Sequence, residues 1–450
     1  MKTVIKRLVF YIQIQLESPL NVASGEDEWT DADILLDFDG NPFVPGSSLA
    51  GAMRSYIGEK DNEWELFGFS KDDIEGKMSP LLISDLVFDQ EPVIGVRDGV
   101  GLNEKKVVKD GCKFDMEILE TGLKGHFYLE LVVREGDLEE EMKKQLAIVF
   151  QGIQQGEIRL GRKKTRGFGA FKITRLSVRS YGKDNYLKYA DAYKASTNEL
   201  ENWLHTDSDS RRMIHIEVPL VMKGGISIRQ YAAKKNEPDF VHITSNGVPV
   251  ISGSSFAGAI RHRVEQILGE LEAGGTKLPV KKKEILQIMF GYVEETAGNQ
   301  ATDAGDGARQ SVNAGSGHAS NVVISEARIL DARPLTMVRT GISRFESAVH
   351  DGALYKEKTY VDGHFTLKIA VQKGKQPVDA KWMTGILLLA VNDLRNGYLA
   401  VGGQTAVGRG VFAPDTSEEY PKGVIFIDGK PRLENQFIAE AFNCLCAHKR

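Results

Sequence analysis

The sequence predicts an α+β protein built from two tandem ferredoxin-like domains, each with a hairpin insertion. The first supporting observation is an internal repeat, because PGSSLAGAMR at Pro45–Arg54 returns as SGSSFAGAIR at Ser252–Arg261. The second is the order of elements within each copy: an alternating strand, an amphipathic helix, further strands, a second helix and a last strand. A β-α-β-β-α-β order with these periodicities is typical of ferredoxin-like folds.

The repeat extends over most of the chain. Five more pairs of matching segments follow in the same order. The offset is 207 residues for the Gly-Ser-Ser pair, 223 for the next and 241 or 242 for the rest, because the second copy carries insertions. They are Phe67-Gly68 with Phe290-Gly291, Ile83–Asp85 with Ile324–Glu326, Val96–Gly99 with Val338–Gly341, Asp110-Gly111 with Asp351-Gly352, and Gly161–Gly169 with Gly402–Gly410. Residues 296–321, rich in small and polar residues, read as a flexible loop inserted in the second copy. Collinear matches of this kind indicate a duplicated domain.

Domain boundaries follow from the repeat. We expect a first domain over residues 1–180, a helical linker over 181–212, a second domain over 213–430 and a C-terminal tail over 431–450. The linker is polar, with helical periodicity in DNYLKYADAYKASTNELENWL.

Composition restricts the class of protein. Of 450 residues, 42% are hydrophobic and 26% charged, as in an ordinary globular protein, and no apolar run is long enough to cross a membrane. Three cysteines favour a reducing compartment, so we expect a cytoplasmic protein with no membrane partner. The net charge of −5 counts mildly against a nucleic-acid binder, although basic residues gather in Arg159–Arg166 and Lys281–Lys283.

Each copy opens with an alternating strand, VIKRLVFYIQIQL in the first and MIHIEVPLVM in the second. After the Gly-Ser-Ser helix come further strands, and Thr121-Gly122 and Asp362-Gly363 read as hairpin turns. A helix, a glycine-rich loop and a last strand close each copy.

The Gly-Ser-Ser segment is the first candidate phosphate site. It places hydroxyls and backbone N–H groups where a helix begins, with the serines at the expected N-cap and an arginine one turn or two further on. An ordinary capped helix explains the same pattern. The candidate residues are Ser47, Ser48 and Arg54 in the first copy and Ser254, Ser255 and Arg261 in the second.

The glycine-rich loop GRKKTRGFG is the second candidate. Its four cations suit a phosphate backbone, whereas its spacing matches neither a P-loop nor a dinucleotide-binding turn. A solvated surface turn is the alternative. The cations are Arg162, Lys163, Lys164 and Arg166, and the second copy keeps the glycines but only Arg409 of the charge.

Clustered carboxylates precede the first Gly-Ser-Ser helix at Asp31, Asp33, Asp37 and Asp39. Such a cluster suits a divalent ion or a general base, and it is equally common in solvated loops. The corresponding loop of the second copy offers Asp239 and His242.

The string NPFVPGSSLAGAMR and the terminal glycine-rich loop, each present twice, resemble the two hallmark segments of RAMP-superfamily CRISPR proteins. The nearest resemblance is to backbone subunits of type III effector complexes, fused in tandem as in type III-D systems. The resemblance implies RRM-like domains that bind guide crRNA, target RNA and other effector subunits. It also implies a thumb hairpin in Val96–Gly111 and in Val338–Gly352, which adds Arg97 and Arg339 to the candidate RNA contacts.

The resemblance further implies cleavage of target RNA that depends on a divalent metal, Mg²⁺ or Mn²⁺. The family's catalytic acid lies six residues before an acid that Asp37 matches, which places Asp31 at the catalytic and metal-binding position, with Asp33 as the near alternative. In the second copy the ungapped alignment places Pro238 there, and a one-residue gap would bring in Asp239.

Three functions therefore stay open on the sequence. They are an RNA-guided endoribonuclease subunit, a guide-binding scaffold without cleavage, and an enzyme on a duplicated ferredoxin-like fold unrelated to RNA. The absence of any cofactor fingerprint weighs against the third.

Overall fold

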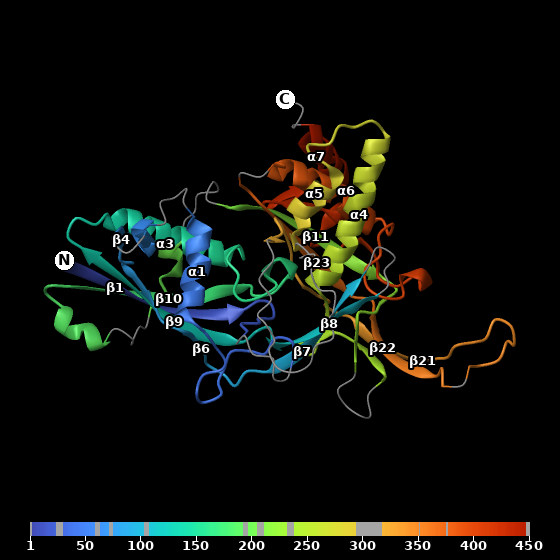
Figure 1. Cartoon of the computed structure of the whole chain (residues 1–450), viewed down its shortest axis with the longest axis horizontal. Helices are drawn as coiled ribbons and strands as arrows, with labels where there is room; N and C mark the ends of the chain where they lie inside the picture. The colour runs from blue at the N-terminus through green and yellow to red at the C-terminus, as the bar shows by residue number, and fades with distance from the viewer. Residues whose placement is uncertain are drawn as a thin grey trace, which may run out of the picture. The chain divides into compact units, whose positions relative to one another are not determined.

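The computed structural model divides into two compact units, Met1–Arg212 with Ile243–Val250, and Met213–His242 with Ile251–Arg450 (Figure 1). The structure describes residues 2–23, 30–58, 64–71, 75–102, 108–191, 197–204, 211–231, 238–293, 317–350, 352–374 and 377–446. The inserted loop predicted over 296–321 therefore lies almost entirely outside the described residues.

The first unit is a ferredoxin-like sheet covered by two helices. Its strands run in the order β10-β1-β9-β6-β2, with β5 also paired to β9, which is the spatial order 4-1-3-2 of the main strands. Helices α1 and α3 lie over one face of this sheet (Figure 1). The bounds are β1 Val4–Leu16, β2 Phe43–Val44, α1 Gly46–Ile57, β5 Leu81–Ile83, β6 Leu86–Phe88, β9 Lys124–Arg134, α3 Glu139–Gln154 and β10 Phe171–Gly182.

Alternation along β1 builds the first core. Phe10, Ile12 and Ile14 are fully buried on the inner face, as the period-two pattern predicts. The ring of Phe150 from α3 packs on Phe10 at 5.9 Å between centroids. The first core therefore lies between the sheet and its helices.

The second unit repeats this plan with one change. The sheet order is β19-β23-β11-β25-β26, with β24 also paired to β11. The last strand of the first copy, β10, is thus replaced by two short strands on β11. The bounds are β11 Met213–Lys223, α4 Gly253–Ala273, β19 Val322–Ile324, β23 His364–Gln372, α6 Ala380–Arg395, β24 Val411–Pro414, β25 Ile425–Ile427 and β26 Lys430–Arg432. The predicted class, tandem ferredoxin-like α+β domains, is confirmed.

A hairpin projects from each sheet. In the first unit β7 pairs with β8, and in the second β21 pairs with β22. The predicted hairpins across Thr121-Gly122 and Asp362-Gly363 are wrong, because β8 pairs with β7 whereas the next strand, β9, pairs with β1. These turns link the projecting hairpin to the main sheet instead. The bounds are β7 Ile94–Leu102, β8 Val108–Leu119, β21 Arg333–Arg339 and β22 Tyr355–Val361.

The linker and the C-terminal segment both pack on their units. Within 181–212 the described residues form the 3₁₀ turns Tyr186–Asp191 and Leu200–Trp203, in place of one long helix. Residues 431–450 contain helix α7, Glu434–Cys446, which buries Phe437 and Ala441 against α6. The C-terminal segment thus contributes to the second core.

Shorter elements complete the described chain. They are α2 Trp64–Phe67, β3 Phe69–Lys71, β4 Glu75–Lys77, β12 Gly225–Ile226, β13 Arg229–Tyr231, β14 Phe240–His242, β15 Thr244–Ser245, β16 Val248–Ile251, α5 Lys282–Phe290, β17 Tyr292–Val293, β18 Gly317–His318 and β20 Ala327–Arg328.

Candidate nucleic-acid interface

The two Gly-Ser-Ser helices begin earlier than predicted, because each N-cap lies two residues before the first serine of the pair. The N-cap of α1 is Pro45, and that of α4 is Ser252, whose hydroxyl accepts a hydrogen bond from the backbone N–H of Ser255. The expectation that the paired serines are N-caps is therefore wrong. They lie in the first turn of each helix, where Ser47, Ser48 and Ser254 are exposed. Pro45 makes no side-chain cap, whereas the Ser252 hydroxyl lies within hydrogen-bond distance of the hydroxyls of Ser254 and Ser255.

Each of these helices exposes a glycine one turn after its serines. A Cβ atom on Gly51 or Gly258 would have nothing within 4 Å outside the helix. Packing therefore does not account for either glycine, although glycine in a helix interior costs about 1 kcal/mol relative to alanine. Arg54, half-buried, and Arg261, exposed, follow three residues later on the same face. The serine, glycine and arginine positions form a stripe that both copies share.

The two glycine-rich loops have the same backbone. Lys163 and Gln404 adopt left-handed conformations with φ of 53° and 58°, and each precedes a 3₁₀ turn. Gly169 and Gly410 also have positive φ, and a Cβ on either would lie 1.9 Å from a carbonyl oxygen of the facing strand segment. These glycines are required by the close approach of backbone to backbone. The loop shape is conserved between the copies even though its charge is not.

Exposure differs among the candidate cations. Arg162 and Lys164 are exposed, Lys163, Arg166 and Arg339 are half-buried, and Arg97 and Arg409 are buried, at 7% exposure each. Lys163 places its ammonium 3.5 Å from the centre of the Phe114 ring on β8. Burial, and then the neighbouring Arg162 charge, lower the pKa of Lys163 to about 8.

We expect the lowered pKa to make any contact between Lys163 and RNA dependent on pH. Because the ammonium is protonated at pH 7 and largely neutral at pH 9, we expect RNA affinity to fall by up to about tenfold between these values. Replacement by methionine should remove most of this pH dependence while lowering the affinity at pH 7. Fluorescence anisotropy with labelled single-stranded RNA measures both, and an unchanged pH profile in Lys163→Met would contradict the assignment.

Asp31 and Asp239 occupy equivalent places in the two copies. The carboxylate of Asp31 accepts a hydrogen bond from the backbone N–H of Asp115 at 3.0 Å, and that of Asp239 accepts one from Lys356 at 2.7 Å. Asp115 and Lys356 correspond at the offset of 241 residues that relates these hairpins. The one-residue gap that brings Asp239 opposite Asp31 is thus the alignment that the fold adopts, and both carboxylates are exposed.

The neighbouring acids have local roles. Asp33 is buried and accepts hydrogen bonds at 2.8 Å from the backbone N–H and the hydroxyl of Thr30. Asp37 closes its own turn by accepting from the N–H groups of Asp39 and Asn41. Asp37 thus forms an Asx-type turn, and Asp33 makes a local contact back to Thr30; neither arrangement requires a ligand.

The surroundings of the two exposed carboxylates differ in charge. Asp31 lies beside a second carboxylate, because its own N–H donates to the side chain of Asp115. Mg²⁺ and Mn²⁺ fit such a pair, since they take one or two carboxylates and fill their other positions with water and phosphate oxygens. The second copy has Lys356 where the first has Asp115, so it offers one carboxylate and a cation. Among the described residues no group of three or more acidic, histidine or cysteine side chains is placed to hold a metal.

The second copy contains an ionic cluster that the sequence analysis did not predict. Glu357 on β22 is 1% exposed and accepts hydrogen bonds from Ser227 at 2.8 Å and Gln404 at 3.0 Å. Three guanidinium groups surround the same carboxylate: Arg229 at 3.3 Å, Arg339 at 3.5 Å and Arg409 at 3.9 Å. Burial alone would raise the pKa of Glu357, but these hydrogen bonds and charges hold it below its ordinary value.

The same place in the first copy is apolar except for Arg97, the counterpart of Arg339, which lies opposite Met116 in the hairpin. At the positions that match Glu357 and Arg409, the first copy has Met116 and Phe168, which belong to a small buried cluster with Ala32 and Ile118. The sequence signal was available in the repeat alignment, which pairs Phe168 with Arg409 and Asp115 with Lys356 at one offset. The contact between these positions becomes visible only when the loop is folded onto the hairpin.

In both copies the acidic loop and the glycine-rich loop meet on one stretch of the projecting hairpin. Lys163 contacts Phe114 and Asp31 binds the adjacent Asp115, whereas Gln404 binds Glu357 and Asp239 binds the adjacent Lys356. The Gly-Ser-Ser helix of the first copy begins elsewhere, where the Gly46 N–H donates to Asp85.

Comparison with known proteins gives one finding. A family model described as the RAMP superfamily matches residues 13–172 and 215–413, that is, most of each repeat. A search of curated proteins finds no match. None of the helices in the described parts of the chain combines the length and the apolar character that a bilayer crossing requires.

Proposed function

The chain belongs to the RAMP superfamily, with a match in each of its two repeats, and from this premise we propose that it is a guide-RNA-binding backbone subunit of a type III CRISPR effector complex. Family membership makes it a CRISPR-associated RNA-binding subunit whose partners are RNA and other CRISPR proteins. The proposal adds that the complex is of type III, with a III-D-like tandem fusion of two backbone subunits. It also adds that the chain binds guide crRNA with its complementary target and is cytoplasmic.

One observation carries the proposal: the glycine-rich loop, the acidic loop and the projecting hairpin converge in the same way in both repeats. Two such sites in one chain suit a ligand with a repeating backbone, such as single-stranded RNA. Exposed cations at Arg162 and Lys164 supply phosphate contacts, and the stripe of Ser47, Gly51 and Arg54 supplies a second surface for the backbone.

Endonuclease activity is the finer part of the proposal. A carboxylate at Asp31 or Asp239 could accept the proton of a ribose 2′-hydroxyl, whose oxygen attacks the adjacent phosphorus while the bond from phosphorus to the 5′-oxygen breaks. Asp31 and Asp115 would hold Mg²⁺ or Mn²⁺, which neutralises charge on the phosphate when bound. The backbone N–H groups of Asp115 and Lys356 orient the two candidate acids, because each donates to one carboxylate oxygen.

A scaffold function without cleavage is the second candidate, and one observation favours it for the second repeat. Lys356 there replaces the second carboxylate of the first repeat, and an ionic cluster replaces its apolar neighbours. The second repeat would then bind RNA and leave cleavage to the first.

Binding to RNA is the first test of the proposal. The purified chain should bind single-stranded RNA, and its affinity should fall linearly with salt on a log–log plot because phosphate contacts release counterions. The assembled complex should retain guide RNA through purification. A chain that binds no RNA at low salt, alone or assembled, would refute the proposal.

The exposed helix glycines allow stability and RNA binding to be tested separately. Alanine at Gly51 or Gly258 should stabilise the chain by about 0.5–1 kcal/mol, since the new methyl group meets no other atom and helix propensity improves. If RNA approaches this face closely, the same change should weaken RNA binding. Thermal unfolding measures the gain in stability, and fluorescence anisotropy on the same preparation measures the loss of RNA affinity. A gain in stability with unchanged affinity would remove the helix face from the interface.

A further inference from the structure

The ionic cluster of the second repeat has more positive charge than its own structure requires. Three arginines surround the single carboxylate of Glu357, so two positive charges are left without a counterion in the cluster. In the first repeat Ala23, Met116 and Phe168 take the places of Arg229, Glu357 and Arg409, so one arginine, Arg97, stands there in place of three arginines and a glutamate. A buried ionic cluster is rarely more stable than well-packed apolar residues of the same volume. We therefore look for a function of these charges beyond packing.

The three arginines are not equivalent. The Arg409 side chain is 8% exposed and fills the place of Phe168, whereas the side chains of Arg229 and Arg339 are 36% and 31% exposed. Both exposed arginines direct their Nε toward Glu357, which leaves the terminal nitrogens of each guanidinium for another acceptor. Arg409 therefore supports the cluster from within, and the other two form its surface.

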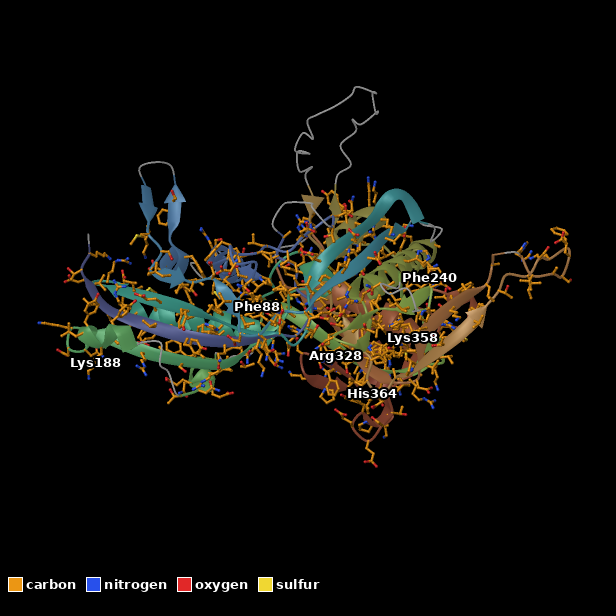
Figure 2. All side chains as sticks on the ribbon, turned by 90° about the horizontal axis from the view of Figure 1, so that it is seen from below. Phe88, Lys188, Phe240, Arg328, Lys358 and His364 are labelled. Carbon is orange, nitrogen blue, oxygen red and sulfur yellow. The ribbon has the colours of Figure 1, made fainter. Side chains whose placement is uncertain are left out.

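Rings and a hydrogen bond restrain Arg229, whose Nε donates to Glu357 at 3.3 Å, whereas Arg339 is held by its ion pair with the same carboxylate. The guanidinium of Arg229 lies 4.5 Å from the Phe240 ring and 5.8 Å from the Tyr355 ring. Figure 2 labels Phe240 and Lys358, which come from the paired strands β14 and β22 at the edge of the cluster. Asp239, which precedes Phe240, binds the backbone of Lys356 immediately before Glu357. The side chains of Arg229, Arg339 and the candidate acid Asp239 thus all contact strand β22.

We propose that Arg229 and Arg339 form a clamp for one RNA phosphate beside Asp239, with buried Glu357 as the residue that positions both guanidinium groups. The proposal rests on the RNA-binding function and adds the group that the second repeat recognises. A planar guanidinium that faces a carboxylate through its Nε keeps its terminal nitrogens for a phosphate, and Arg229 and Arg339 supply the positive charge that Glu357 alone does not balance. The first repeat has no such clamp, because Ala23 and Met116 occupy the places of Arg229 and Glu357.

The direct test is RNA binding by the full chain. We expect Arg229→Ala/Arg339→Ala to weaken binding of a labelled single-stranded RNA about tenfold or more and to lower the salt slope by about 0.7, the value for one phosphate contact on a single strand. Arg432→Ala is the matched control, since that arginine is 28% exposed and pairs with one carboxylate, Glu440, in the same unit. Equal affinity and slope in the double variant and the wild type would overturn the clamp.

A second variant tests positioning apart from folding. Glu357→Met/Arg409→Phe copies the apolar residues of the first repeat, so the unit should fold with its stability kept or raised. It removes one negative and one positive charge, which leaves the net charge unchanged. We expect a clear loss of RNA affinity in a protein whose melting temperature has not fallen. Affinity at the wild-type level would refute the role of Glu357, whereas a wild type that binds no RNA would refute the proposed function itself.

Discussion

Alanine in place of both Asp31 and Asp239 is expected to lower cleavage of complementary target RNA by at least about a hundredfold in the assembled complex. Each carboxylate is exposed and is oriented by one backbone N–H of the hairpin, so its removal deletes a functional group without emptying a core. Guide binding should persist, because phosphate contacts come from other residues. Denaturing gels of labelled target RNA measure the loss.

The single variants separate the two repeats. Asp31→Ala should remove the larger share of cleavage, because its repeat supplies the second carboxylate at Asp115, whereas the second repeat supplies Lys356. Asp37→Asn is the matched control, since that acid only closes its own turn. Full cleavage by the double variant would contradict the endonuclease part of the proposal and favour the scaffold.

Alanine at Gly410 is expected to destabilise the second unit by about 3–5 kcal/mol. The new Cβ would lie 1.9 Å from the carbonyl oxygen of Val401, and φ of 70° is strained for any residue with a side chain. Gly169→Ala should do the same in the first unit, because its Cβ meets Leu160 at the same distance. Chemical denaturation followed by circular dichroism measures the loss.

Gly408→Ala separates the two causes of that loss. Its φ is 82°, yet a Cβ there would have nothing within 4 Å, so only the strain of the left-handed backbone remains. We expect a loss of about 1–2 kcal/mol. If Gly408→Ala and Gly410→Ala lost equal stability, the close approach to Val401 would not be the reason for glycine.

Much of the fold was predictable because it depends on local patterns that occur twice. Alternation in Phe10, Ile12 and Ile14 predicts the inner face of the first strand, and the repeated Gly-Ser-Ser string predicts the first helix of each copy. The error about the hairpins arose at strand partners distant in sequence. The turn at Thr121-Gly122 has hairpin chemistry, but its flanking strands pair with different neighbours.

The candidate site shows the same division. The sequence determined two tandem copies, the family, and the identity of the exposed acids and loop cations, because these depend on residue type and order along the chain. Only the tertiary structure decided that Asp239 rather than Pro238 matches Asp31, and that Arg409 belongs to a buried cluster around Glu357. The physical reason is that both results depend on contacts between segments more than fifty residues apart in the sequence. Strand pairing and burial, not the local sequence, determine which residues meet there.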